Sequence, residues 1–343
     1  MLWSGARDAA IALADRCGAL LSNTLPARGL FHDHPFGLGI TGSYFTTLGR
    51  EMYESADVVL AVGTSLSYYV GGGHFWPKAY KIQLDDAPRG LRDGLKAADL
   101  YVKADALAGC EAILAGLDKK LGAGKPTAAS IRTKELAHRI ATEPADAMEF
   151  EVAPGVLDPR KAVEAIDAVV PKDWDIVVGG GHQAYFNAQM RGRPADRYTT
   201  VREFGAVGNG LSYALGVAAA RRQGRNGKVV LFEGDGGLFF NIQELETIKR
   251  QGYRILICAM NDGGYGSEFH KLRADGLPDD GAVFGRPDFA SIANGFGIAG
   301  HRLDDLAALP ALVDQVIASG GPAVIDVPVS DKVVSPVIQR SHG

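Results

Sequence analysis

The stretch Lys228–Gly266, KVVLFEGDGGLFFNIQELETIKRQGYRILICAMNDGGYG, alternates apolar runs with glycine-rich segments. The runs Lys228–Phe232 and Tyr253–Met260 have the composition of buried strands, because they are dominated by aliphatic and β-branched residues. Between them, Asn241–Arg250 has helical spacing and opens on the capping-box pattern N-x-x-E. A strand, a helix and a second strand in this order predict one unit of a parallel sheet.

Two aspartates each follow one of these predicted strands. Asp235 and Asp262 are 27 residues apart, which suits one strand–helix–strand unit. Loops that follow neighbouring parallel strands meet at the carboxyl edge of the sheet, so we expect the two side chains to converge. Two carboxylates and a carbonyl from a glycine loop suit Mg²⁺, which takes water and phosphate oxygens as its other ligands. Glycine amides and a helix start favour an anion beside the metal.

The residues alone therefore predict a magnesium–diphosphate site. The alternative is a pair of ordinary turns in which Asp and Asn side chains cap helices.

The same alternation of strands and helices extends along the chain. The other expected strands are Asp57–Val62, Tyr80–Leu84, Leu100–Val102, Asp175–Val178 and Ala323–Val327. The other expected helices are Arg7–Cys17, Leu107–Leu117, one near residues 130–141, Gly208–Gln223, Asp288–Phe296 and Asp304–Ser319. Buried strands that alternate with helices predict the α/β class, with a doubly wound parallel sheet in each half.

This pattern divides the chain into two expected domains. Residues 1–121 form the first, residues 122–158 are a linker that carries a helix, and residues 159–343 form the second. The first domain opens on the helix Arg7–Cys17 with no strand before it. Because doubly wound domains usually begin with a strand, we expect the first domain to lack its first strand.

Composition excludes several classes of protein. The 343 residues carry 36 basic and 40 acidic side chains, a net charge of −4, and a general nucleic-acid binder would normally be basic. The longest apolar stretches are too short to span a bilayer, and the first residues do not resemble a signal peptide. Three widely spaced cysteines form no disulfide framework, which favours a reducing, cytoplasmic location. No membrane or nucleic-acid partner is expected.

Several motifs together resemble one enzyme superfamily. GDGG followed by ND resembles the thiamine-diphosphate fingerprint, and FGAVGNGLSYALG and GGGHQAYFNAQ resemble other parts of the same cofactor-binding domain. GLFHDHPFGLGITG and ADVVLAVGTSL resemble the central domain of these proteins. The chain is therefore similar to the central and C-terminal domains of thiamine-diphosphate-dependent enzymes of the acetolactate synthase, benzoylformate decarboxylase and pyruvate decarboxylase type. The resemblance implies a Rossmann-like central domain, a diphosphate-binding domain, and the cofactors thiamine diphosphate and Mg²⁺.

The resemblance also implies roles for residues of the two glycine-rich loops. Asp235 and Asp262 would be the side-chain ligands of the metal, with the Gly264 carbonyl as the third ligand. The superfamily usually has Asn at the position of Asp262, so an Asp there adds negative charge near the diphosphate. The residues that would approach the diphosphate or offer it backbone amides are Gly234, Gly236, Gly237, Tyr265 and Gly266.

Two further loops are implied in cofactor binding. His182, preceded by Gly181, resembles a histidine near the diphosphate, although a histidine after a strand can also be purely structural. The Gly205 carbonyl would accept a hydrogen bond from the 4′-amino group of the cofactor. Val207 would lie between the two cofactor rings and hold them in a folded shape, and its alternative role is that of a core residue.

Weaker candidates lie nearby. Glu268, His270 and Lys271 follow the second loop and could line a substrate entrance, or form a solvated face. Some relatives bind FAD in the central domain, and Gly71–His74 could contact a flavin. Because the arginines expected to bind a flavin diphosphate are sparse, we expect no FAD.

One catalytic group of the superfamily is missing from these motifs. A glutamate beside the pyrimidine ring comes from an N-terminal pyrimidine-binding domain of a neighbouring subunit, and no glutamate of this chain matches it. No catalytic residue is therefore assigned. The expected substrate is a small 2-oxoacid or aldehyde, and the expected partner is a second copy in a homodimer or tetramer, or a separate pyrimidine-domain subunit. The reaction would be decarboxylation or carboligation, with full activity requiring the partner or missing domain.

Two alternatives from other functional classes stay open. One is a non-catalytic module that binds the cofactor or regulates another protein. The other is an FAD-containing oxidase-like relative, which a yellow colour of the purified protein would reveal.

Overall fold

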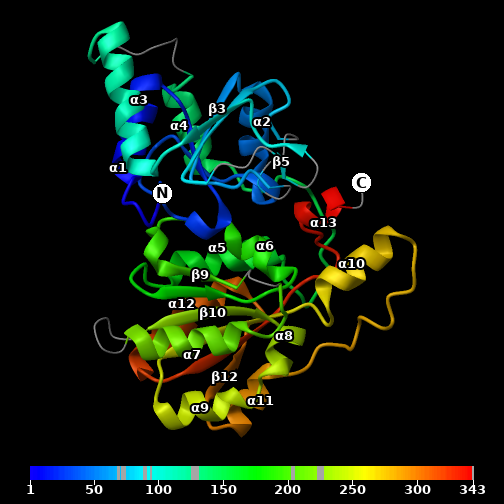
Figure 1. The fold of residues 1–343 in the computed structure, drawn as a ribbon. Coiled ribbons are helices and arrows are strands. Elements are labelled where there is room, and N and C mark those ends of the chain that lie inside the picture. Colours follow the sequence, from blue (N-terminus) through cyan, green and yellow to red (C-terminus); the bar gives the residue numbers. More distant parts are fainter. Residues whose placement is uncertain are drawn as a thin grey trace. The chain divides into compact units, whose positions relative to one another are not determined.

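The chain divides into two compact units. The computed structural model describes residues 1–67, 70, 75–87, 91–92, 95–124, 131–201, 205–221 and 228–341 (Figure 1). The first unit is Met1–Ala147 and the second is Met148–Gly343. The boundary falls inside residues 122–158, and the helix α4 (Lys134–Thr142) there packs into the core of the first unit through Leu136 and Ile140.

The second unit is built on a six-stranded sheet in which all the pairs are parallel. In spatial order the strands are β12 (Ala299–Arg302), β13 (Ala323–Pro328), β11 (Ile255–Asn261), β10 (Val229–Gly234), β8 (Asp175–Val178) and β9 (Tyr198–Thr200). The central strands β10 and β11 are buried on both faces. That burial explains their nearly continuous apolar sequence, since helices cover both faces of such a sheet.

Helices cover the two faces of this sheet, as Figure 1 shows. On the face that carries Leu231 lie α7 (Gly210–Arg221), α8 (Asp235–Phe240), α9 (Glu244–Gln251) and α11 (Phe289–Gly295). The other helices of the unit are α5 (Pro159–Val169), α6 (Gln183–Ala188), α10 (Gly266–Ala274), α12 (Leu309–Ser319) and α13 (Pro336–Ser341). Two short 3₁₀ turns, η4 (Ala195–Arg197) and η5 (Leu306–Ala308), complete the described elements of this unit.

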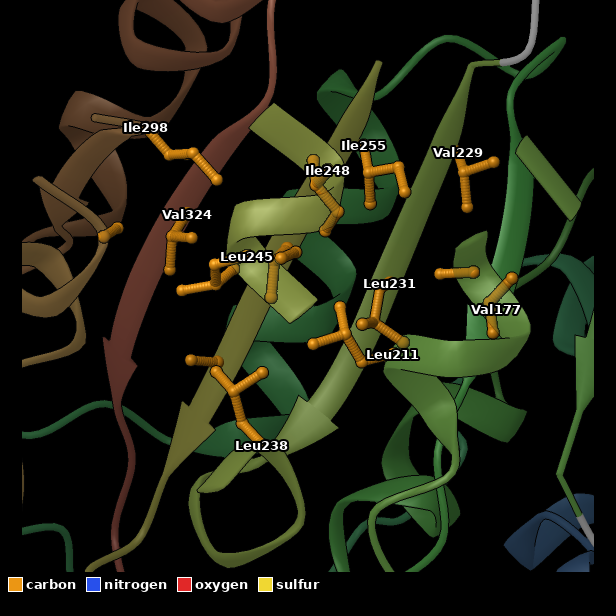
Figure 2. Close-up of a cluster of buried hydrophobic side chains, with 14 of the residues drawn as sticks. Val177, Leu211, Val229, Leu231, Leu238, Leu245, Ile248, Ile255, Ile298 and Val324 are labelled. Atoms are coloured by element: carbon orange, nitrogen blue, oxygen red, sulfur yellow. The ribbon is translucent and has the colours of Figure 1, made fainter. Parts of the chain in front are cut away.

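The core of the second unit lies between the sheet and α7, α8, α9 and α11. Figure 2 shows Leu231 of β10 surrounded by apolar side chains from the sheet and these helices, among them Leu211 of α7 and Leu238 of α8. All three residues are fully buried. The core therefore fixes the start of α8 against the end of β10, where the first glycine-rich loop lies.

We expect the substitution Leu231→Ala to lower the free energy of unfolding of the second unit by about 2–5 kcal/mol, because it removes buried methyl groups and leaves a cavity. Urea denaturation followed by circular dichroism measures the loss. Ile317→Ala, at a residue 36% exposed on α12, is the matched control and should cost about 1 kcal/mol or less. Equal losses for the two variants would contradict the packing around Leu231.

In the residues that the structure describes, the first unit has two parallel sheets. One holds β1 (Leu21–Asn23) and β2 (Gly37–Ile40), and the other has the order β3 (Val58–Val62), β4 (Tyr80–Asp85) and β7 (Leu100–Lys103). A short antiparallel pair is formed by β5 (Leu91–Arg92) and β6 (Leu95–Lys96). The described helices of this unit are α1 (Arg7–Cys17), α2 (Thr47–Ser55), α3 (Ala106–Leu121) and α4, with the described 3₁₀ turns η1 (Leu25–Ala27) and η2 (Gly42–Tyr44).

The expected fold class is confirmed, because each unit is α/β with parallel sheets. The expected capping box is wrong: α9 begins at Glu244 without a side-chain cap, and the Asn241 side chain instead donates to the Gly208 carbonyl over 2.7 Å. The sequence also missed α8, whose first turn contains Asp235. Among the described residues no helix has the length and apolar character needed to cross a membrane.

Candidate functional site

Four loops of the second unit converge at the carboxyl edge of its sheet. Two of them follow β8 and β11, a third is the direct junction of β10 and α8, and the fourth, residues 205–209, precedes α7. The strands β8, β10 and β11 are neighbours in the sheet. Parallel strands direct their carboxyl ends to one edge, where ligands of such sheets bind. The structure thus brings together the glycine-rich loops that the sequence had placed far apart along the chain.

Asp235 connects two of these loops. It is the first residue of α8, directly after β10, and its side chain is buried. Its Oδ1 accepts a hydrogen bond from the Gly236 amide and its Oδ2 accepts one from the Gly263 amide, both over 2.7 Å. One carboxylate therefore holds the loop after β11 against the start of α8.

Asp262 faces Asp235 from the loop after β11. Burial raises the pKa of both carboxyl groups, and the negative charge of Asp235 raises the pKa of Asp262 further. Two buried carboxyl groups side by side are costly without a compensating positive charge. A divalent cation between them would supply that charge, so the pair fits a metal.

A third protein ligand for a metal would come from the backbone. In the described residues no group of three or more His, Cys, Asp or Glu side chains is arranged to hold a metal ion. Gly264 pairs with Val283 in an isolated antiparallel bridge, and the neighbouring amides of Tyr265 and Phe284 donate to Ala282 and Gly263. The Gly264 carbonyl oxygen accepts neither of these two hydrogen bonds. Two carboxylates and one carbonyl form the hard oxygen set that Mg²⁺ prefers.

Some of the expected amide donors are already engaged. The Tyr265 amide, which was expected to donate to a diphosphate, donates to the Ala282 carbonyl over 2.8 Å. The Gly236 amide donates to Asp235. Gly237 and Gly266 lie in the first turns of α8 and α10, where helical backbone amides lack partners within the helix. These two amides are the better candidates for an anion.

His182 lies in the loop after β8, buried beside the aspartates. The Ser335 amide donates to its Nε2 over 3.0 Å, so the proton of the neutral ring is on Nδ1. That Nδ1 is 4.0 Å from the nearer carboxylate oxygen of Asp262. Burial, together with the neighbouring His270, lowers the pKa of His182 well below its ordinary value. A neutral His182 therefore presents an N–H group toward Asp262.

The loop before α7 carries two of the predicted residues. Gly205 is exposed and has φ +72°, a conformation that favours glycine. Val207 is 39% exposed, so its side chain is accessible at this edge. Asn241 ties the loop to the end of α8 through the Gly208 carbonyl, and Gly181 lies exposed on the neighbouring loop. Phe204, the first residue of the FGAVG motif, lies outside the described residues.

Glu233 is a site residue that the sequence analysis missed. It is the second-last residue of β10 and is fully buried. A Cβ atom at Gly179, Gly210 or Gly237 would overlap its carboxyl group, so three glycines make the space that it occupies. Burial raises the pKa of Glu233 to about 8, although the Gly234 and Gly210 amides oppose the rise. An acidic residue inside the apolar run VVLFE was the signal that could have revealed it.

Aromatic side chains border the two glycine-rich loops. Tyr265 packs edge-on against Phe284 at a centroid distance of 5.4 Å, and Phe240 lies 6.3 Å from Tyr265. Phe240 and Phe284 are both exposed. A Cβ at Gly236 would meet the Tyr265 ring at 2.6 Å, which explains why only glycine fits there. No role for these rings was predicted from the sequence.

The three weaker candidates after the second loop separate in the structure. His270 is buried, and its ring centroid is 4.5 Å from that of His182. Glu268 and Lys271 have half-exposed side chains and approach each other at 3.8 Å. His270 thus belongs to the interior of the site, whereas the other two fit a solvated face. Gly71–His74, on which the flavin expectation rested, lie outside the described residues.

Two family models match this chain. Residues 1–113 match the family described as thiamine pyrophosphate enzyme, central domain, and residues 179–327 match thiamine pyrophosphate enzyme, C-terminal TPP binding domain. Thiamine pyrophosphate is another name for thiamine diphosphate. The second match contains all four loops of the candidate site. The chain belongs to the thiamine-pyrophosphate-dependent enzyme superfamily and comprises its central and C-terminal domains.

Several named proteins are similar to the chain over most of its length. The acetolactate synthase isozyme 2 large subunit of Escherichia coli K12 is 25% identical over 303 residues, covering 87% of this chain and 52% of that protein. The probable chloroplastic acetolactate synthase 2 of Oryza sativa subsp. japonica is 27% identical over 327 residues, covering 90% and 48%. A probable 2-ketoarginine decarboxylase of Pseudomonas aeruginosa PAO1 is 27% identical over 311 residues, covering 89% and 52%. The chain spans about half the length of these relatives.

Proposed function

We propose that this chain is the part of a 2-oxoacid decarboxylase or carboligase that binds thiamine diphosphate and Mg²⁺. The observation that carries the proposal is the pair Asp235 and Asp262, two carboxyl groups held together at the ends of neighbouring strands with glycine amides around them. The named relatives, acetolactate synthases and a decarboxylase, support the reaction class.

In this proposal the chain's own residues position a metal and a diphosphate. Asp235, Asp262 and the Gly264 carbonyl hold Mg²⁺, and the amides of Gly237 and Gly266 donate to the diphosphate beside it. Asp262 is negatively charged when it binds the metal, whereas the Asn usual at this position is neutral. The Asp therefore binds the metal more tightly, and it repels the diphosphate somewhat more than an Asn would. Neutral His182 limits that repulsion by directing an N–H group toward Asp262.

The organic part of the cofactor would lie along the loop before α7. The Gly205 carbonyl accepts from the 4′-amino group, and the exposed Val207 side chain supports the two rings. When bound, thiamine diphosphate supplies an electron sink for breaking a bond next to a carbonyl group. The residues of this chain position the cofactor and supply the fixed charges around the diphosphate. The aromatic side chains of Phe240, Tyr265 and Phe284 exclude water from the site.

The group that activates the cofactor is proposed to come from another polypeptide or domain. No glutamate of this chain matches the activating glutamate of the superfamily by motif. Glu233 is enclosed below the glycines. A small 2-oxoacid would therefore be processed efficiently only when a partner completes the site, whether a second copy, a separate subunit or a further domain.

The test measures binding and turnover separately. Calorimetric titration of the purified chain with thiamine diphosphate should show binding that requires Mg²⁺ and disappears with a chelator. Release of CO₂ from pyruvate, a small 2-oxoacid, should stay below about 1% of a typical turnover number of 10 s⁻¹. Binding without turnover supports the proposal. No Mg²⁺-dependent binding would refute the cofactor site, and efficient decarboxylation would refute the need for a partner.

A further inference from the structure

Glu233 carries a buried carboxyl group to which the proposed function assigns no role. It lies on the central strand β10, two residues before Asp235, and its side chain is fully buried. Burying an acidic side chain is costly unless the surrounding groups bind it. The groups around its two carboxyl oxygens therefore indicate what this side chain does.

The alternation of side chains along β10 places Glu233 at the end of a row of core residues. Val229, Leu231 and Glu233 point to the same face of the sheet, because successive residues of a strand alternate between its faces. Val229 and Leu231 belong to the apolar core that includes side chains of α7 and α8. Glu233 continues this row at the carboxyl edge of the sheet, so its carboxyl group lies between the apolar core and the loops of the site.

Three glycines from different elements surround the carboxyl group. A Cβ atom would lie 2.2 Å from both carboxyl oxygens at Gly179, 2.1 Å from Oε2 at Gly210 and 2.5 Å from Oε1 at Gly237. Gly179 directly follows β8, Gly210 is the first residue of α7, and Gly237 lies in α8. None of the three has a positive φ, so the backbone conformation would permit alanine at each. Glycine is needed at these positions because Glu233 occupies the space.

Backbone amides bind the carboxyl group from two directions. The Gly234 amide donates to Oε1 over 3.2 Å, and the Gly210 amide also interacts with the carboxyl group. Gly210 begins α7, and the first amides of a helix lack acceptors within the helix. Glu233 therefore supplies an acceptor to the start of α7 from the central strand. This contact connects β10 to the residue that directly follows the loop 205–209.

The loop 205–209 lies at the surface of the carboxyl edge. Gly205 and Val207 are exposed, so their side chains contribute little to holding the loop in place. The Asn241 side chain donates to the Gly208 carbonyl over 2.7 Å. The position of this loop thus depends on polar contacts, and the contact of Glu233 at the start of α7 fixes its carboxyl-terminal end.

The start of α8 is held by a different set of contacts. Leu238 packs into the core of the second unit, and Asp235 accepts from the amides of Gly236 and Gly263 over 2.7 Å. Loss of the carboxyl group of Glu233 would therefore leave the two aspartates in place and would release the start of α7. The diphosphate and the rings of the proposed cofactor would then be affected to different extents.

We propose that Glu233 is a positioning residue that sets the place of the loop 205–209, and with it Val207, relative to the metal and the diphosphate. The proposal rests on the proposed cofactor site, because this loop is where the rings of thiamine diphosphate would lie. Glu233 acts through the backbone of Gly210 and does not touch the cofactor. Its side chain serves as a spacer and an acceptor between β8, α7 and α8.

Inorganic pyrophosphate provides a test, because it has the diphosphate of the cofactor without the rings. Calorimetric titration of the full chain with Mg²⁺ compares the affinities for thiamine diphosphate and for pyrophosphate. Glu233→Ala should weaken binding of thiamine diphosphate by about 10-fold or more, and should change pyrophosphate binding by less than about 3-fold. Glu233→Gln keeps the volume and one acceptor oxygen, so it should bind both ligands within about 3-fold of the chain without substitutions.

The exposed Glu246 of α9 provides a matched control. Glu246→Ala also removes one carboxyl group from the second unit and should leave both affinities unchanged. Equal losses for the two ligands in Glu233→Ala, or no loss for either, would overturn the proposal. A loss in Glu233→Gln as large as that in Glu233→Ala would overturn it too.

Hydrogen exchange without any ligand separates this proposal from the proposed function. In Glu233→Ala the Gly210 amide should exchange at least about 10-fold faster, as measured by NMR, while the buried Ala214 in the body of α7 keeps its rate. If the chain without substitutions bound neither ligand, the proposed cofactor site would be refuted, and exchange at Gly210 would still decide whether Glu233 positions α7. Unchanged exchange at Gly210, or equal acceleration at Gly210 and Ala214, would contradict the positioning role.

Discussion

Replacing Asp235 by alanine should abolish Mg²⁺-dependent binding of thiamine diphosphate, with a loss in affinity of about 100-fold or more. The substitution removes a proposed metal ligand. It also leaves the amides of Gly236 and Gly263 without their acceptor, because the carboxylate of Asp235 binds both over 2.7 Å. The loop after β11 would then lose its connection to α8, so the second proposed ligand, Asp262, would be displaced too.

Calorimetry with and without Mg²⁺ measures this effect, and thermal unfolding shows whether the variant folds. Asp235→Asn is the conservative comparison, since it keeps an oxygen for one amide but lacks the charge that binds the cation. Asp314→Ala, at an exposed position of α12, is the control for losing one negative charge from the unit. If Asp235→Ala bound the cofactor as tightly as Asp314→Ala, the metal site would have to be elsewhere.

Replacing Gly266 by alanine should weaken the same binding by about 10- to 100-fold without unfolding the protein. A Cβ at Gly266 would overlap the carboxylate of Asp262 and lie 2.9 Å from the Cβ of His182. The added methyl group would push the carboxylate away from Asp235, and it would stand beside an amide proposed to contact the diphosphate. Fluorescence or calorimetric titration of the folded variant measures the change.

A glycine in open space provides the matched control. Gly216 lies inside α7, and a Cβ there would meet nothing within 4 Å. Gly216→Ala should therefore leave cofactor affinity unchanged and raise the free energy of unfolding by about 0.5–1 kcal/mol, because alanine loses less backbone entropy in a helix. Similar affinities for Gly266→Ala and Gly216→Ala would show that the crowding at Gly266 has no effect on binding.

The strands of the second unit were predictable because their residues are apolar almost without interruption. The predicted Asp175–Val178 coincides with β8, and the predicted Ala323–Val327 differs from β13 by one residue. The short strands β9 and β12 were not predicted from the sequence. Their sequences, YTT and AGHR, contain no apolar run long enough to indicate a strand. Edge strands are buried less, so their sequences carry a weaker signal.

The local structure of the candidate site was harder to predict. The motif N-x-x-E indicated a helix cap, but Asn241 bonds to Gly208, 33 residues away in the chain. The GDGG segment was expected to be a loop, and it is instead the first turn of α8 because Leu238 is drawn into the core. In both cases a tertiary contact outweighs a local preference.

The sequence by itself determined the alternation of strands and helices, the α/β class and the positions of Asp235 and Asp262 directly after two neighbouring strands. These features depend on periodicity and on turn residues, which act over a few positions along the chain. Only the tertiary structure decided which groups meet, as where Glu233 is enclosed by Gly179 and Gly210 and where His182 accepts from the Ser335 amide. Those contacts join residues that are distant in sequence, so their partners, burial and pKa values exist only after the chain has folded.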